Sequence, residues 1–201
     1  MNFIIKSEFS DYINSFLEQN SVINLISKNE EKYIFEKHIF DSLAIGIFFK
    51  KYNIHPKNLL DIGTGGGFPA VPIAIEYPNI QVTALDSIRK KINAINNIKQ
   101  ELDIKNLTPL CSRAENLQNI KFDIITSRAV AKINILTKYV SPLLKQDGYF
   151  VAYKSKLADE EINEALNILN KLNLKHIDTL EYRLPLPEVF ERKLLIFKKL
   201  T

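Results

Sequence analysis

The feature that most constrains this chain is a glycine-rich turn between a short apolar strand and a helix. Leu59 to Ile62 read as a short buried strand that breaks directly into Gly63-Thr-Gly-Gly-Gly67. Glycines let the backbone approach a ligand closely, and the start of the next helix presents unpaired N–H groups. A second apolar run, 80–85, ends in Asp86, where a carboxylate can bind two ribose hydroxyls. The sequence therefore predicts a site for a nucleotide-type cofactor.

Two cofactor patterns compete for these glycines. The spacing Asp61-x-Gly63-x-Gly65-x-Gly67 is the form used by S-adenosylmethionine (SAM) methyltransferases. The spacing Gly65-x-Gly67-x-x-Ala70 also satisfies the dinucleotide pattern, which tolerates Ala at its last position. Asp61 favours SAM, because a carboxylate at the end of the strand can bind the cofactor ammonium through Gly N–H or water contacts. The same carboxylate would repel the pyrophosphate of a dinucleotide.

Composition limits the class of protein. The 201 residues suit one domain with a substantial core, and 46% hydrophobic with 25% charged residues is typical of a soluble globular protein. We expect a cytoplasmic protein without a membrane segment or leader sequence, since no apolar stretch is long enough and Cys111 is the single cysteine. The formal charge of +4 is compatible with a polyanionic partner and does not establish one. We expect a monomer.

Apolar spacing divides the chain into a helical part and an alternating part. Residues 7 to about 49 have helical periodicity, interrupted by a connection over 20–27. Strands and helices alternate from residue 58, which predicts an α/β fold with a doubly wound, mostly parallel seven-stranded sheet, Rossmann-like as in SAM methyltransferases. We expect a single domain, 1–201, with an N-terminal helical cap over 1–55 and a SAM-binding core over 56–201. The predicted elements are strands 58–62, 80–85, 107–111, 122–126, 148–153, 175–184 and 192–199, and helices 69–77, 88–102, 133–144 and 157–171.

The last two predicted strands also distinguish a SAM-binding fold from a dinucleotide-binding fold. Two consecutive strands, 175–184 and 192–199, predict an antiparallel hairpin. A SAM methyltransferase fold ends in such a hairpin, whereas a nicotinamide-dependent dehydrogenase would continue with further βαβ units.

Two loops at the carboxyl ends of strands carry further candidate residues. Ala114 and Glu115 follow the third strand, where a SAM site places the adenine. Arg128 follows the fourth strand and should point into the cleft, toward O6 or a phosphate of the acceptor or the cofactor carboxylate. The chain lacks the Asn/Asp-Pro-Pro-aromatic run of adenine amino methylases and the Pro-Cys nucleophile of pyrimidine C5 methylases. An acceptor that needs no base, such as guanine N7, is therefore favoured.

His38 and Asp41 are three residues apart on a predicted helix and share one face. Asp41 could orient His38, or both could contact a substrate, but our preferred interpretation is a surface pair. Two candidate ligands without a third give a weak metal signal, so we expect no metal. Cys111 is interpreted as a small core residue.

Together these motifs resemble the RsmG (GidB) family of bacterial 16S ribosomal RNA guanine-N7 methyltransferases, over most of the chain. The glycine turn followed by Phe68-Pro69 and by Pro72 is more specific than the general methyltransferase form. The segments that carry the resemblance are Asn24-Leu25 with Ser27, His38-Ile-Phe-Asp41-Ser42, Asp61 to Pro72, Leu85-Asp86-Ser87 with Lys90-Lys91, Ser127-Arg128-Ala129, and Ala152-Tyr-Lys154. The chain departs from the family pattern at Ala70, Ser155 and Lys193, where Gly, Gly and His are usual.

The resemblance implies methyl transfer from SAM, leaving S-adenosylhomocysteine, to N7 of a guanine in the 530 loop of 16S rRNA, within the 30S subunit or a precursor. It implies cofactor contacts at Gly63, Phe68, Ala114, Glu115 and Arg128, with Asp86 on the ribose. It also places Asn24, His38 and Asp41 in a helical wall near the acceptor. For the rim of the cleft, we expect Lys154, Arg192 and Lys193 to meet the RNA.

Three other functions stay open on the sequence alone. A nicotinamide-dependent oxidoreductase is disfavoured by Asp61 and by the terminal hairpin. A methyltransferase with a protein or small-molecule acceptor would use the same cofactor site. A ribosome-assembly factor that binds SAM or RNA and turns over slowly is disfavoured by the intact Asp61, glycine and Arg128 set.

Overall fold

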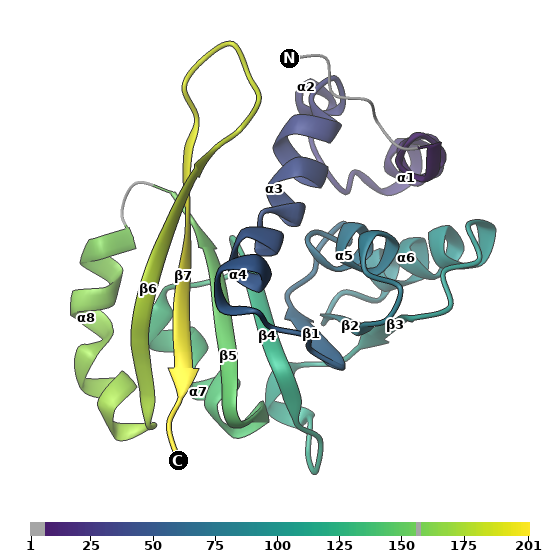
Figure 1. The fold of residues 1–201 in the computed structure, drawn as a ribbon. Helices are drawn as coiled ribbons and strands as arrows, with labels where there is room; N and C mark the ends of the chain where they lie inside the picture. The colour runs from purple at the N-terminus through teal and green to yellow at the C-terminus, as the bar shows by residue number, and fades with distance from the viewer. Residues whose placement is uncertain (1–6, 156–157) are drawn as a thin grey trace.

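The computed structural model describes residues 7–155 and 158–201. Helices precede the first strand and then alternate with strands, as the apolar spacing predicts (Figure 1). The α-helices are α1 (Ser7–Ile23), α2 (Lys28–Glu31), α3 (Asp41–Leu43), α4 (Ile45–Tyr52), α5 (Ala70–Glu76), α6 (Arg89–Glu101), α7 (Ile133–Leu143) and α8 (Ala158–Lys171); η1 (Phe35–Phe40) is π-helical and η2 (Ala114–Asn116) is a 3₁₀ turn.

The described residues form one seven-stranded sheet in the order β3-β2-β1-β4-β5-β7-β6. Its first five strands are parallel, and β7 pairs antiparallel with both β5 and β6. This confirms the predicted fold class and the terminal hairpin, with β7 as the reversed strand inserted into the sheet. The strands are β1 (Asn58–Ile62), β2 (Gln81–Asp86), β3 (Leu107–Cys111), β4 (Phe122–Arg128), β5 (Leu144–Lys154), β6 (Leu174–Arg183) and β7 (Glu191–Lys199).

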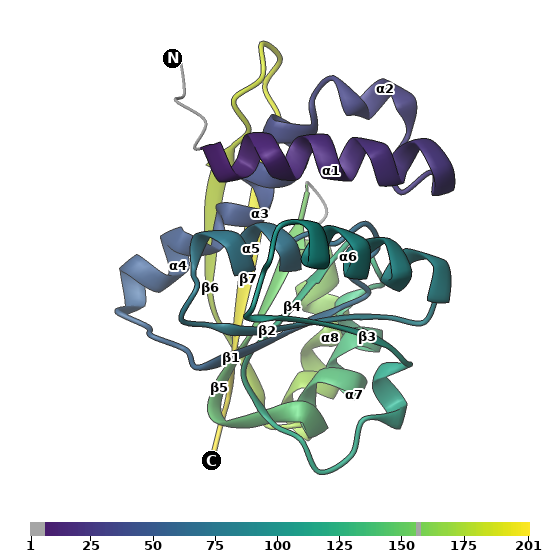
Figure 2. The same cartoon turned by 90° about the vertical axis from the view of Figure 1, so that its right-hand side faces the viewer.

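Helices cover both faces of the sheet, so the parallel strands are buried on two sides, as such sheets require. On one face α4, α5 and α6 pack against the sheet, while α7 and α8 cover the other (Figures 1 and 2). Helix α1 lies outside α5 and α6 (Figure 2). Tyr12 and Phe16 of α1 are fully buried and meet Phe68 at ring-centroid distances of 6.1 and 5.1 Å. The N-terminal helices therefore share a hydrophobic core with the glycine turn.

The glycine turn has the backbone that its sequence predicts. Gly63, Gly65 and Gly67 have φ values of +72°, +57° and +95°, a region that only glycine occupies without strain. A Cβ at Gly63 would lie 2.4 Å from the Val130 side chain, so a glycine is also needed for this close approach. Helix α5 begins at Ala70, directly after the turn, and Pro72 lies in its first turn where proline is tolerated.

The largest difference from the sequence prediction lies in the helical part. Instead of regular helical structure from the connection to about residue 49, the chain forms a π-helical segment, η1, which is followed by α3 and α4. Helix α1 runs to Ile23, so the predicted connection over 20–27 shortens to the residues between α1 and α2. Apolar periodicity does not predict a π-helical segment, because such segments are rare and occur mostly as single turns within otherwise α-helical stretches. Among residues 7–155 and 158–201, no helix combines the length and apolar character needed to cross a bilayer.

Candidate active site

A cavity of about 1300 Å³ opens at the carboxyl ends of β1, β2 and β4. The strand order reverses between β1 and β4, and open α/β sheets bind ligands at such a switch point. One side of the cavity consists of the glycine turn and the loops after β2 and β3. The other side consists of the N-terminal helices, the end of β4 and the start of β7. The cavity therefore lies between the α/β core and the helices that precede it.

Asp86 holds the glycine turn in place. Its Oδ2 accepts a hydrogen bond from Gly65 N at 2.9 Å, and its Oδ1 accepts one from Ile88 N at 2.9 Å. Each carboxylate oxygen keeps a second lone pair, and Asp86 lines the cavity with 9% of its surface exposed. A Cβ built on Gly65 would meet only Gly63 O, at 3.9 Å, so the backbone of the turn is open on that side. The carboxylate and the open turn fit a cofactor that carries a ribose.

Seven of the predicted cofactor residues line this cavity and two do not. The lining residues are Gly63, Gly65, Phe68, Asp86, Ala114, Glu115 and Arg128. Asp61 and Gly67 are fully covered and lie outside the lining. Asp61 therefore does not line the cavity, and its contact with the cofactor ammonium through Gly N–H or water stays a prediction.

Asp61 instead lies beneath the turn, in the core. Its Oδ1 accepts a hydrogen bond from Thr126 Oγ1 at 2.9 Å, and its Oδ2 has no partner in the described part of the chain. Burial raises the pKa of Asp61 to about 7, while the Thr64 and Thr126 hydroxyls, the charge of Arg128 and the Ala70 N–H act in the other direction. The Asp61 carboxyl group therefore belongs to the core beneath the turn and not to the cavity lining.

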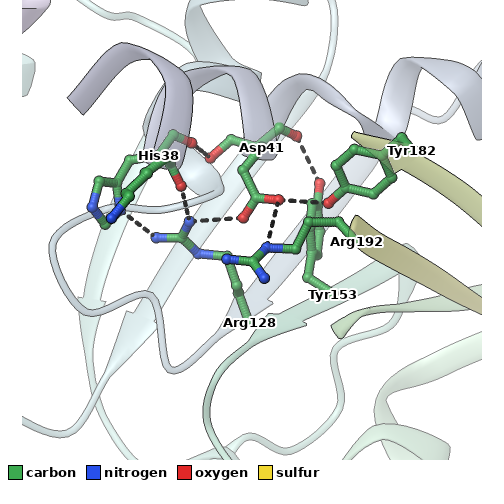
Figure 3. A network of polar contacts seen from close by, with 8 residues as sticks. His38, Asp41, Arg128, Tyr153, Tyr182 and Arg192 are labelled. Atoms are coloured by element: carbon green, nitrogen blue, oxygen red, sulfur yellow. Dashed lines mark hydrogen bonds and ion pairs between the residues drawn. The ribbon is translucent and has the colours of Figure 1, made fainter. Parts of the chain in front are cut away.

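Arg128 is the centre of a polar cluster on the side of the cavity formed by the N-terminal helices, which we call the acceptor side for the role predicted above (Figure 3). Its Nη1 donates to Lys37 O at 3.2 Å and to Asp41 Oδ2 at 3.0 Å, and its Nη2 lies 3.0 Å from His38 Nδ1. Its guanidinium also lies over the Phe68 ring, 5.3 Å from the centroid. These contacts use three of the five N–H donors of the guanidinium and leave two for a ligand.

The interpretation of His38 and Asp41 as a surface pair is wrong. Only 8% of His38 and 3% of Asp41 is exposed, and both line the cavity against Arg128. His38 also stacks on Phe68 with a ring-centroid distance of 4.8 Å. His38 lies in the π-helical η1, which ends directly before Asp41, the first residue of α3. Such segments often occur at functional sites.

His38 provides a test through pH. Burial and the neighbouring Arg128 charge lower the pKa of His38 to about 4, below its usual 6.5. Between these two values the unfolded chain binds more protons, so stability is lost as the pH falls from 6.5 toward 4. We expect wild type to lose about 2–3 kcal/mol of unfolding free energy between pH 7.5 and 4.5 relative to His38→Gln.

Denaturant unfolding of both proteins at the two pH values measures this difference. The raised pKa of Asp61 acts in the opposite direction over the same range, and it cancels because both proteins contain Asp61. A constant difference between wild type and His38→Gln would contradict a buried, neutral His38.

The structure brings together only some of the residues predicted to contact the acceptor or the RNA. Asn24 is exposed, has φ +50° and lines the cavity, as do Lys154 and Arg192. Lys154 is not a free rim cation, because its Nζ donates to Ala131 O at 2.9 Å and to Glu161 Oε2 at 2.7 Å. Lys193 lies outside the cavity lining and pairs with Glu181 across the hairpin at 3.2 Å. Adjacent residues of β7 point to opposite faces, so Arg192 and Lys193 cannot share one role.

Three aromatic residues of the site were missed by the sequence reasoning. Tyr182 Oη donates to Asp41 Oδ1 at 2.6 Å, and Tyr153 Oη donates to Ser42 O at 2.7 Å (Figure 3). Burial, together with the charge of Asp41, raises the pKa of Tyr182, so it stays a donor. Phe190 lines the cavity from the loop between β6 and β7. Only Tyr153 had a signal in the sequence, as the middle residue of the Ala152-Tyr-Lys154 segment.

The described residues contain no group of three or more His, Cys, Asp or Glu side chains that could hold a metal ion. Cys111 is half-buried, with its Sγ 3.7 Å from Ser87 O, so it is less enclosed than a core residue.

Comparisons with known proteins agree with this geometry. Residues 5–185 match the family described as rRNA small subunit methyltransferase G. The chain is 35% identical over 199 residues to ribosomal RNA small subunit methyltransferase G of Lysinibacillus sphaericus, covering 96% of this chain and 82% of that protein. It is 39% identical over 185 residues to the protein of that name from Streptococcus pyogenes, covering 90% and 78%.

Among solved structures, a SAM-dependent methyltransferase from Clostridium acetobutylicum superposes with a TM-score of 0.64 at 16% identity. The match covers 86% of this chain and 99% of that one. At this identity the likeness shows the fold.

Proposed function

Because the chain belongs to the rRNA small subunit methyltransferase G family, we propose that it methylates N7 of a guanine in the 530 loop of 16S ribosomal RNA. As a member of this family it is a SAM-dependent methyltransferase. One cavity contains both the glycine turn with Asp86 and the Arg128 cluster, and this arrangement is the main support for placing the activity there. One part suits a nucleoside cofactor and the other an anionic or hydrogen-bonding acceptor.

The cofactor side uses residues that the fold places at the ends of β1, β2 and β3. In the proposal, the open turn at Gly63 and Gly65 receives the amino-acid part of SAM, Asp86 binds the ribose hydroxyls, and Ala114 and Glu115 lie against the adenine. Asp61 supports the turn from beneath. When bound, SAM supplies a methyl group that a positively charged sulfur activates.

The acceptor side needs no base. Guanine N7 carries a lone pair, which forms the new bond to the methyl carbon as the bond from that carbon to sulfur breaks with its electron pair. No proton is released, and the positive charge ends on the guanine. Arg128 stays protonated and, because Lys37 O, Asp41 and His38 fix its guanidinium, it can position the acceptor through its two remaining donors.

We further propose that the protein acts as a monomer and as one domain, with residues 1–55 capping the core of residues 56–201. Its substrate is the 16S rRNA of the 30S subunit or of a precursor. The shared hydrophobic core between α1 and the glycine turn supports the single domain, since the cap and the cofactor side cannot move independently without exposing Phe16 and Phe68.

A labelled-methyl transfer assay tests the proposal. Purified protein and radiolabelled SAM are incubated with 30S subunits that lack the modification, and the label is mapped by cleavage chemistry specific for 7-methylguanosine. We expect label at one guanine of the 530 loop. Label on another RNA or on a protein would show that the acceptor is a different molecule. SAM binding without transfer to any 16S substrate would favour an assembly role.

A further inference from the structure

The acceptor side of the cavity contains an aromatic ring that the proposed chemistry has not yet used. Four aromatic side chains line the cavity among the described residues, namely Phe68, Tyr139, Tyr153 and Phe190. Phe68 and Tyr153 are each only 3% exposed, because they pack into the core. Tyr139 lies on α7, on the sheet face opposite the N-terminal helices. Phe190 is half-buried and lies in the loop that rises beside those helices (Figure 1).

A backbone hydrogen bond fixes the position of Phe190. Leu184 N donates to Phe190 O at 3.1 Å, which closes the loop between β6 and β7 at its base. Arg192, two residues further on, lines the same cavity with its Nε 3.8 Å from Asp41 Oδ1. Phe190 therefore enters the cavity beside the cluster that holds Arg128.

The face of this ring already attracts positive charge. Lys37 Nζ lies 5.4 Å from the centroid of Phe190 and 5.2 Å from that of Tyr33. The backbone oxygen of Lys37 also accepts a hydrogen bond from Arg128. Lys37 therefore links the Phe190 ring to the Arg128 guanidinium on one side of the cavity. Cation–π attraction of this kind is stronger where water is excluded.

We propose that Phe190 supplies the aromatic face on which the acceptor guanine stacks during methyl transfer. This inference rests on the proposed function, and it adds the residue that recognises the base. Proteins that read unpaired RNA stack its bases on aromatic rings. A guanine methylated at N7 is a cation, so the face that holds the Lys37 ammonium suits the charge that develops as the methyl group arrives. The long Lys37 side chain can leave the ring and meet a phosphate.

Variants at Phe190 test the proposal in the transfer assay. We expect Phe190→Leu to lower kcat/KM for the unmodified 30S subunit by about 5- to 100-fold, the range for one lost base–aromatic stack. Phe190→Tyr should stay within about threefold of wild type, because it keeps the ring. The matched control is Val189→Ala, at the neighbouring residue, which is 69% exposed and lies outside the cavity lining. SAM affinity by calorimetry should be unchanged in all three.

The outcomes separate this inference from the proposed function. Equal rates for wild type and Phe190→Leu would overturn the stacking role, as would a parallel loss of SAM affinity, which would indicate a structural defect. Failure of wild type to label any small-subunit RNA would overturn the proposed function instead. For that case a direct measurement remains, because the chain contains no Trp. We expect 7-methylguanosine monophosphate to quench Phe190→Trp fluorescence at lower concentration than guanosine monophosphate, and absence of quenching by both would overturn the inference.

Discussion

Arg128→Ala is expected to lower the rate of methyl transfer by at least about 100-fold, the usual cost of removing one preorganised donor from an active site. It should also lower the unfolding free energy by about 2–3 kcal/mol, because Asp41 is 3% exposed and loses its closest cationic partner. Tyr182 Oη, at 2.6 Å, still donates to that carboxylate, so the fold should survive. Transfer to 30S subunits and denaturant unfolding measure the two effects.

A second substitution separates the two effects. In Arg128→Ala/Asp41→Asn the buried charge that lost its closest cationic partner is gone, so stability should return toward wild type while the rate stays low. Recovery of the rate together with stability would show that Arg128 acts only by supporting the fold. Arg128→Lys is the matched control for charge, and it should stay well below wild type because an ammonium cannot make the forked contacts to Lys37 O, Asp41 and His38 at once.

Asp86→Ala is expected to weaken SAM binding by about 100-fold or more, since two hydrogen bonds from ribose hydroxyls to a charged acceptor are lost. Calorimetry with S-adenosylhomocysteine measures this directly, and unchanged affinity would contradict the ribose contact. The carboxylate also accepts from Gly65 N and Ile88 N, so part of the loss can come from a loosened turn. Asp86→Asn is the control, because it keeps one acceptor oxygen for the turn.

A thermodynamic cycle distinguishes the ribose contact from the support of the turn. The affinities of wild type and Asp86→Ala are compared for S-adenosylhomocysteine and for an analogue that lacks both ribose hydroxyls. If Asp86 binds the ribose, the effect of the substitution should largely disappear with the analogue. If the two changes are additive, Asp86 acts through the backbone of the turn alone.

The sequence predicted well which residues line the cavity beside the glycine turn, because that part of the cavity is built from short segments. The turn from Gly63 to Gly67 and the carboxylate of Asp86 each follow a strand directly, and parallel strands bring their carboxyl ends to one edge of the sheet. Local spacing is then enough to bring these residues together. Asp61 differs, since the direction of a side chain at the end of a strand depends on what packs over it, and here the carboxylate is buried and accepts a hydrogen bond from Thr126.

The acceptor half could not be predicted in the same way. His38 and Asp41 seemed a surface pair because helical spacing says which residues share a face and not what covers that face. Their burial comes from Arg128 and Tyr182, 87 and 141 residues away from Asp41 along the chain. Likewise, charge alone could not separate Arg192, which lines the cavity, from Lys193, which pairs with Glu181 on the other face of the hairpin.

The sequence by itself determined the sheet, its terminal hairpin and the glycine turn, and it favoured SAM over a dinucleotide, since these depend on periodicity, glycine conformation and residues that are neighbours along the chain. Only the tertiary structure decided which residues surround Arg128, which lysines are tied into ion pairs, and which aromatic ring enters the cavity. Those outcomes depend on contacts between the N-terminal helices, β4 and the last two strands. Such contacts form because buried charges and donors need partners, and chain spacing does not record which partners the packing of the core brings within reach.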